Sequence, residues 1–329
     1  MKARILSVFF LLFITVSCDQ LSSNNEDTIV WDMPTPFADT IFHTQNIYQF
    51  VKDVEQLTEG VLKIRVHSHA SLYKHPEIKQ AVRAGQVPIG EIVISLLGNE
   101  NSLFEVDSLP LLATSYEEAQ KLWDVSQADI SKLLESQGLK LLYAVPWPPQ
   151  GLYIKKPVTS LDDFQGLKIR VYNVTLTRLV ELMHGTPTTV QSPEIPQAFS
   201  TGVIDAMITS PSTGVGSQCW DYVGYYYDIK TWIPKNMVIV NQKAFNALPK
   251  NFQQALIKAA GKAEQRGWAM SQQETEEKLD VLRQHGMKVL KPTDEFKTSL
   301  DKIRRTMIEE WRAKSGQEGE KILKSFFEQ

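Results

Sequence analysis

Cysteine is almost absent from this chain of 329 residues, which contains only Cys18 and Cys219. Two cysteines cannot supply a disulfide framework, so a hydrophobic core has to hold the fold together. The chain also lacks an excess of positive charge, because 35 Lys and Arg residues stand against 38 Asp and Glu residues. Nucleic-acid-binding domains are usually strongly basic, so we expect no nucleic acid among the partners.

The motifs of common enzyme chemistry are missing as well. The sequence has no His-Glu-x-x-His zinc helix, no Gly-x-Ser-x-Gly nucleophile elbow and no phosphate-binding glycine loop. One alternative remains, a metal-dependent enzyme built on His67, His69 and His75 with Glu77. On a strand, His67 and His69 face the same side, but His75 lies beyond an expected turn. We therefore expect a protein without catalysis, metal or cofactor.

Long apolar runs are scarce, and the one that stands out covers residues 5–16, directly after Lys2 and Arg4. It is too short to span a bilayer, which takes about 20 apolar residues, and no later segment has the required length and hydrophobicity. A basic start, a short apolar stretch and a small residue are typical of an export signal. We expect residues 1–17 to be a signal peptide.

The end of this signal resembles a bacterial lipobox. Residues 15–18 read Thr-Val-Ser-Cys, and in a lipobox the cysteine is acylated and becomes the first residue of the mature protein. The resemblance implies lipidation of Cys18, with the polar residues 18–27 as a tether. Asp19 resembles an inner-membrane retention signal, so the expected location is the periplasmic side of the inner membrane in a bacterial cell envelope. A plain signal peptide with an incidental cysteine is the alternative.

Beyond the tether, the hydrophobic pattern predicts a first α/β half. Apolar residues at helical spacing end at Gly60, and alternating apolar and polar residues follow at 62–67, as in a strand with one buried face. A second helix is expected at 75–84, and an apolar strand at 92–97.

A second half repeats this plan, with an alternating strand at 167–172 and a helix up to Gly185. The letters recur too, since Lys-Ile-Arg-Val at 63–66 returns at 168–171, and residues 81–85 are echoed by residues 198–202 in the same order. We infer two α/β lobes of similar construction.

The connections between the lobes can also be placed. Residues 146–151 are rich in proline and are expected to carry the first crossover. Pro249 opens the longest helical pattern, which runs to Gly286; about 35 residues would reach roughly 50 Å, enough to brace both lobes.

We expect lobe I to comprise residues 28–146 plus about 236–272, and lobe II to comprise residues 147–235 plus about 273–329. Two such lobes leave a cleft between them, where small ligands are commonly held and where hinge closure occurs.

Several segments resemble, in order, the extracytoplasmic solute receptors of TRAP transporters, the DctP-like family. The central signature matches Gly-Leu-Lys-Ile-Arg-Val at 166–171, Gly-Thr-Pro at 185–187, Glu194 and Gly-Val-Ile-Asp at 202–205; further matches lie at 50–60, 107–110, 238–241 and 245–249. The resemblance covers nearly all of the mature chain. It implies a two-lobed α/β fold like that of type II periplasmic binding proteins, an organic acid as ligand, and the small and large membrane subunits of the transporter as partners.

The resemblance also implies where the ligand binds. In that family the lobes close on an organic anion, and the arginine in the position of Arg170 forms a two-pronged salt bridge with its carboxylate. A guanidinium suits this task because it is planar, charged and matches a carboxylate bidentately. Nothing in the local letters separates Arg170 from Arg65, so only the resemblance selects it.

Two departures from the family restrict the class of ligand that we expect. Where its sialic-acid receptors carry a further arginine, this chain has Gln150, which forms hydrogen bonds but brings no charge. The family's asparagine after the Gly-x-x-Asp segment falls near Thr209. We expect Thr209 and Ser210 to contact the ligand through their hydroxyls, although a turn around Pro211 explains them equally well. The ligand is thus expected to be a monocarboxylate.

Aromatic residues gather where the cleft is expected, and we expect Trp31, Phe37 and Trp147 to form apolar walls around the ligand. Trp147 lies among prolines beside Gln150. These walls favour a ligand with an apolar or aromatic body. Two other binding functions stay open, namely presentation of the ligand to a sensor and service to an ABC-type transporter.

Overall fold

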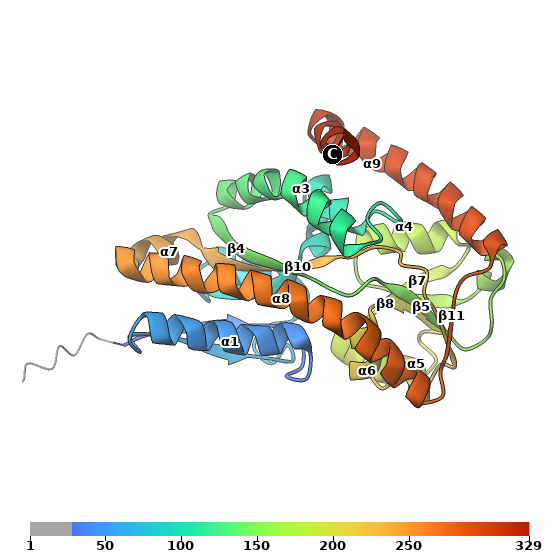
Figure 1. Ribbon diagram of the computed structural model, residues 1–329, viewed down its shortest axis with the longest axis horizontal. Coiled ribbons are helices and arrows are strands. Elements are labelled where there is room, and N and C mark those ends of the chain that lie inside the picture. The colour runs from blue at the N-terminus through green and yellow to red at the C-terminus, as the bar shows by residue number, and fades with distance from the viewer. Residues whose placement is uncertain (1–27, 329) are drawn as a thin grey trace, which may run out of the picture.

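The computed structural model describes residues 28–328. The expected signal peptide, the lipidation site Cys18 and the tether at 18–27 lie outside the described residues. Within the described part, no helix has both the length and the hydrophobicity that crossing a membrane requires. In Figure 1 the elements form two groups along the long axis, and α8 (Lys250–Gln284) runs across both.

Lobe I is built on the strand pair β1–β2 and on the three-stranded sheet β3-β10-β4. β1 and β2 are parallel, β1 lies against β3, and β10 runs antiparallel between β3 and β4. The elements are β1 (Ile29–Pro34), α1 (Phe42–Leu57), β2 (Leu62–His67), α2 (His75–Arg83), β3 (Ile89–Val93), η1 (Ile94–Leu97), η2 (Ser102–Ser108), α3 (Tyr116–Ser136), β4 (Leu139–Pro146), β10 (Lys235–Asn241) and α7 (Gln242–Ala247).

Lobe II is built on a six-stranded sheet with the order β11-β9-β5-β8-β6-β7. β6 is parallel to both β7 and β8, whereas β5 is antiparallel to β8. The elements are β5 (Gly151–Ile154), η3 (Leu161–Phe164), β6 (Lys168–Val171), α4 (Val174–Leu182), β7 (Thr186–Thr189), η4 (Ser192–Glu194), α5 (Ile195–Ser200), β8 (Ala206–Thr209), α6 (Pro211–Gly216), η5 (Cys219–Asp221), β9 (Tyr225–Tyr227) and β11 (Lys288–Leu290).

The two lobes share one plan, but the recurring letters do not mark it. The unit β1-α1-β2-α2-β3 corresponds to β6-α4-β7-α5-β8, since each has its first strand in the middle and an antiparallel strand beyond its third. By this plan β6 corresponds to β1. The repeated Lys-Ile-Arg-Val, however, lies in β2 and β6, so our matching of these strands was wrong. Alternation of apolar and basic residues is common to many half-buried strands, which explains the echo.

The chain passes from lobe I to lobe II between β4 and β5, within the proline-rich segment 147–150. This agrees with the predicted crossover. The chain returns to lobe I between β9 and β10.

The predicted long helix is present as α8, with 35 residues. Leu256 and Ala263 pack in the core of lobe I, and Leu279 and Leu282 pack in a core of lobe II. A Cβ atom added at Gly267 would lie 2.4 Å from a methyl carbon of Val145 in β4. Glycine therefore lets the backbone of α8 approach the lobe I sheet closely.

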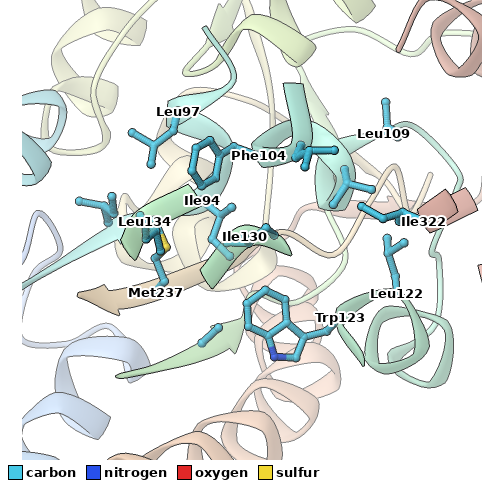
Figure 2. Close-up of a cluster of buried hydrophobic side chains, with 14 of the residues drawn as sticks. Ile94, Leu97, Phe104, Leu109, Leu122, Trp123, Ile130, Leu134, Met237 and Ile322 are labelled. Atoms are coloured by element: carbon cyan, nitrogen blue, oxygen red, sulfur yellow. The ribbon is translucent and has the colours of Figure 1, made fainter. Parts of the chain in front are cut away.

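The last helix, α9 (Asp294–Glu328), also contacts both lobes. Phe296 and Leu300 pack in a lobe II core, whereas Ile322 belongs with Leu122 of α3 to the lobe I core drawn in Figure 2. Between them, Gly316 departs from helical geometry with φ 60° and ψ −142°. The segment 273–329, which we expected in lobe II, thus includes a final part that packs on lobe I.

One predicted strand has different bounds in the structure. We expected a strand at 92–97, but β3 ends at Val93 and residues 94–97 form the 3-10 helix η1. The ladder with β10 stops at Val93, opposite Asn236. An apolar run alone does not separate a strand from a buried helical turn.

Candidate functional site

A cavity that is partly open to solvent lies between the lobes, with about 450 Å³ of space free of protein atoms, open solvent included. Both lobes supply side chains to its wall, together with the two segments that cross between them. The lining residues are Phe37, His75, Val93, Trp147, Gln150, Arg170, Tyr172, Gln191, Ser192, Thr209, Thr213 and Pro234.

Arg170 supplies the positive charge of this cavity. Its side chain is 4% exposed, its Nε–H donates to the Val190 carbonyl at 2.9 Å, and its guanidinium lies 5.1 Å from the centre of the Tyr172 ring. Burial lowers the pKa of Arg170 to about 10, which leaves it charged at neutral pH. Among residues 28–328, no Asp or Glu lies within ion-pair distance of this guanidinium. Because a buried charge without a partner is costly, the cavity favours an anion.

Two aromatic side chains form the apolar part of the wall. The rings of Phe37 and Trp147 meet edge to face, with centroids 4.9 Å apart. The indole Nε1–H of Trp147 donates to the Asn236 side-chain oxygen at 2.7 Å. The Trp147 ring is therefore held by packing and a hydrogen bond, the Phe37 ring is held by packing, and both give the cavity an apolar surface.

Neutral polar groups complete the wall. The amide nitrogen of Gln150 donates to the Pro148 carbonyl at 3.1 Å, and its side-chain oxygen has no hydrogen-bond partner in the described part of the chain. Thr209 lies at the end of β8 and is 4% exposed. These groups give the cavity hydrogen-bonding capacity without a second charge.

A model of the family described as "Bacterial extracellular solute-binding protein, family 7", or DctP, matches residues 37–314. The chain belongs to this family. As a DctP-family protein it is an extracytoplasmic solute receptor of the TRAP type, a class that binds small organic acids and works with membrane subunits.

Solved structures and curated proteins agree with this assignment. Bordetella pertussis DctP7, described as a receptor binding pyroglutamic acid, is 45% identical over 91% of this chain and 100% of its own, with a TM-score of 0.90. A TRAP solute-binding protein from a marine metagenome, described as specific for pyroglutamate, is 37% identical over 92% and 99%, also with a TM-score of 0.90. The C4-dicarboxylate-binding protein DctP of Rhodobacter capsulatus is 26% identical over 72% of each chain. These similarities confirm the two-lobed fold predicted for this receptor.

Two of the residues expected in the site of this DctP-family receptor do not line the cavity. Trp31 lies in β1 and packs in the core of lobe I. Ser210 caps α6, where its hydroxyl accepts the Thr213 backbone N–H at 3.1 Å. The turn around Pro211, which was our alternative for Ser210, accounts for its position.

Sequence reasoning missed several lining residues. Tyr172 had a detectable signal, because it stands two residues after Arg170 and so shares its face of an extended chain. Thr213, Gln191 and Ser192 follow strands of lobe II at short distances, and no local pattern singles them out.

The histidines considered for a metal site lie in different surroundings. His67 pairs with Asp32 at 2.7 Å, whereas His75 lines the cavity and accepts the Val93 backbone N–H on Nε2 at 3.1 Å. Residues 28–328 contain no group of three or more His, Cys, Asp or Glu side chains placed to hold a metal ion. Burial, with a smaller contribution from Arg170, lowers the pKa of His75 to about 3. The ring is therefore neutral, and its proton lies on Nδ1.

Proposed function

We propose that this receptor captures a small cyclic monocarboxylate of the pyroglutamate class and delivers it to the membrane subunits of a TRAP transporter. The observation that carries the proposal is Arg170, a buried guanidinium on the cavity wall with no carboxylate partner among residues 28–328. Support comes from three related structures, 45%, 42% and 37% identical to this chain, each described with pyroglutamate or pyroglutamic acid as its ligand.

The balance of charge supports a single carboxylate on the ligand. Within the described residues, Arg170 is the only Lys, Arg, Asp or Glu on the cavity wall, and His75 is neutral. A dicarboxylate would bury a second anion without a cation to meet it, which is costly. Gln150 and Thr209 offer hydrogen bonds in its place.

The neutral groups support a ring that contains an amide. We propose that the ring lies against Trp147 and Phe37. The Nδ1–H of His75 has no protein partner in the described chain, so it is available to donate to the ring carbonyl, and the free oxygen of Gln150 is available to accept from the ring N–H. A lactam has both complementary groups in a small, flat frame.

Capture and release need only a conformational change. We propose that residues 28–146 with 236–272, and residues 147–235 with 273–329, close as two lobes over the ligand, and that Arg170 meets the carboxylate first. The final part of α9 packs on lobe I and would stay with it. We further propose that Cys18 carries a lipid that anchors the receptor, with residues 18–27 as the tether.

A panel of acids tests this function. The chain without residues 1–18 is titrated by calorimetry with L-pyroglutamate, tetrahydro-2-furoate, L-proline, succinate and a neutral sugar. We expect L-pyroglutamate to bind most tightly. Tetrahydro-2-furoate should be weaker because it has no ring carbonyl and no N–H, and succinate should be weaker again. Tighter binding of succinate or of the sugar would overturn the proposal.

A further inference from the structure

Directly behind the two aromatic walls lies a carboxylate that does not itself line the cavity. Glu91, in β3, is 2% exposed. One of its oxygens accepts the Thr35 hydroxyl, and the other accepts the Asn236 side-chain N–H at 2.8 Å. Both neighbours donate to it, an arrangement that suits a carboxylate because each of its two oxygens can accept.

Each of these donors is also attached to one wall. The side-chain oxygen of Asn236 accepts the Trp147 indole N–H at 2.7 Å. Because an indole N–H can only donate, the Asn236 oxygen must face Trp147 and its amide nitrogen must face Glu91. On the other side, the Thr35 hydroxyl oxygen accepts the Phe37 backbone N–H at 3.4 Å. Glu91 thus joins two chains of hydrogen bonds, one ending on each wall.

The remaining polar neighbours do not neutralise Glu91. His43, in α1, lies with Nδ1 3.5 Å from a Glu91 oxygen and stacks on Trp147 with ring centroids 4.2 Å apart, but burial holds the pKa of His43 well below its usual value. Burial raises the pKa of Glu91 to about 7, in spite of the hydrogen bonds from Thr35 and Asn236. A carboxylate buried in this way costs stability, and an apolar residue would suit the core better.

We propose that Glu91 is a positioning residue of the binding site, which fixes the Trp147 and Phe37 rings in the orientation that the ligand meets. The proposal rests on the proposed function only in treating these rings as ligand walls. Glu91→Gln should disturb the arrangement, because an amide has only one accepting oxygen and brings no negative charge. If that oxygen serves Asn236, the amide nitrogen faces Thr35, whose hydroxyl must then accept instead of donate.

The matched control is Glu264→Gln. Glu264 is a partly buried carboxylate that accepts the Ala144 backbone N–H at 3.2 Å, and it does not line the cavity. Calorimetry with L-pyroglutamate and thermal unfolding without ligand are measured for both variants. We expect Glu91→Gln to weaken ligand binding about 10-fold, which corresponds to roughly 1.4 kcal/mol. Glu264→Gln should change the affinity less than about twofold. Equal effects on affinity would assign Glu91 a structural role only.

A double-mutant cycle with Trp147→Phe separates positioning from general weakening, because phenylalanine has no N–H to hold. In that background Glu91→Gln should cost clearly less affinity than it does in the natural chain. Full additivity would overturn the proposal. Thr35→Val removes one hydrogen-bond donor to Glu91 with little change of side-chain shape. If Glu91→Gln does not fold, Thr35→Val takes its place in the test. An unchanged ligand affinity in Thr35→Val would then contradict the proposal.

A spectroscopic measurement keeps this test independent of the ligand. The difference in fluorescence between the natural chain and Trp147→Phe gives the emission of Trp147. Glu91→Gln should shift this emission whether or not the natural chain binds L-pyroglutamate. Failure of L-pyroglutamate to bind to the natural chain would refute only the proposed function. Unchanged Trp147 emission would refute the positioning role whatever the ligand is.

Discussion

The two Lys-Ile-Arg-Val segments place their arginines in opposite surroundings. Arg65 lies in β2, at the edge of its strand pair, with 65% of its side chain exposed and with the Asp32 carboxylate 3.6 Å away. Arg170 lies in β6, between β7 and β8, and is 4% exposed. The first arginine has water and a counter-ion, whereas the second has neither a carboxylate partner in the described chain nor much contact with water.

The residue opposite each arginine explains part of the difference. Asp32 of β1 stands opposite Arg65, and Thr188 of β7 stands opposite Arg170. Directly opposite residues share one face of a sheet and lie close together. A carboxylate in that place neutralises an arginine, and a threonine leaves it available to a ligand. The residue on the neighbouring strand and the burial of the strand thus decide whether an arginine is a surface charge or is available to bind a ligand.

Separate removal of each arginine should give the largest difference in ligand affinity. Arg170→Ala would leave the ligand's carboxylate buried without a cation, which costs about 3–5 kcal/mol, so affinity should fall at least about 100-fold. Arg170→Lys should recover only part of it, because an ammonium lacks the two-pronged geometry. Arg65→Ala should change affinity less than about twofold. Calorimetry checks all three, and equal losses at Arg65 and Arg170 would show that the wrong arginine was selected.

Giving Arg170 the neighbour that Arg65 has should produce the next largest effect. Thr188→Asp places a carboxylate opposite Arg170, where it competes with the ligand, and affinity should fall about 10-fold, or roughly 1.4 kcal/mol. Thr189→Asp is the control, since Thr189 is exposed and its side chain points to the other face of β7. Titration of both variants decides; an unchanged affinity in Thr188→Asp would contradict our account of the site.

A pH series extends the comparison from buried arginine to buried carboxylate. Burial raises the pKa of Glu91 from 4.5 to about 7. Between these values the folded protein keeps a proton that the unfolded chain has released, so the contribution of Glu91 to stability decreases as pH rises through this window. Melting temperatures from pH 5 to pH 8 should therefore fall more steeply in the natural chain than in Glu91→Gln. Parallel curves would mean that Glu91 does not titrate there.

The smallest effect is expected from removal of the exposed ion pair between Arg65 and Asp32. Asp32→Ala removes the carboxylate that faces Arg65 and His67. Exposed ion pairs contribute less than about 1 kcal/mol, so denaturant unfolding should show a small loss of stability. Ligand affinity should stay unchanged, and a clear loss of affinity would show that the β1–β2 strand pair is linked to the site.

Much of the fold could be predicted because its elements carry local signals. The 3.6-residue spacing and the terminal glycine marked α1, and Pro249 and Gly286 enclosed α8. The end of β3 could not be predicted, because it depends on where β10 stops pairing. For the same reason the equivalence of β6 with β1 was hidden, since strand order is a property of the sheet rather than of any four letters.

The site was predictable only in part. The family resemblance led to Arg170, Gln150 and Trp147, and the structure brings these three together around one cavity. It leaves Trp31 in the core and Ser210 at a helix end. His75 could not be singled out, because its place on the cavity wall depends on a contact with Val93 that no spacing in the sequence encodes.

The amino-acid sequence by itself determined the α/β character, the two-lobed plan, the long helix and the family, because periodicity, helix-ending residues and ordered motifs are local. Only the tertiary structure decided which of two identical four-residue segments carries a buried charge. It also decided which aromatic rings reach the cavity and which carboxylate lies behind them. Burial and pairing depend on what packs against a side chain, and in this protein those neighbours come from strands and loops far away along the chain.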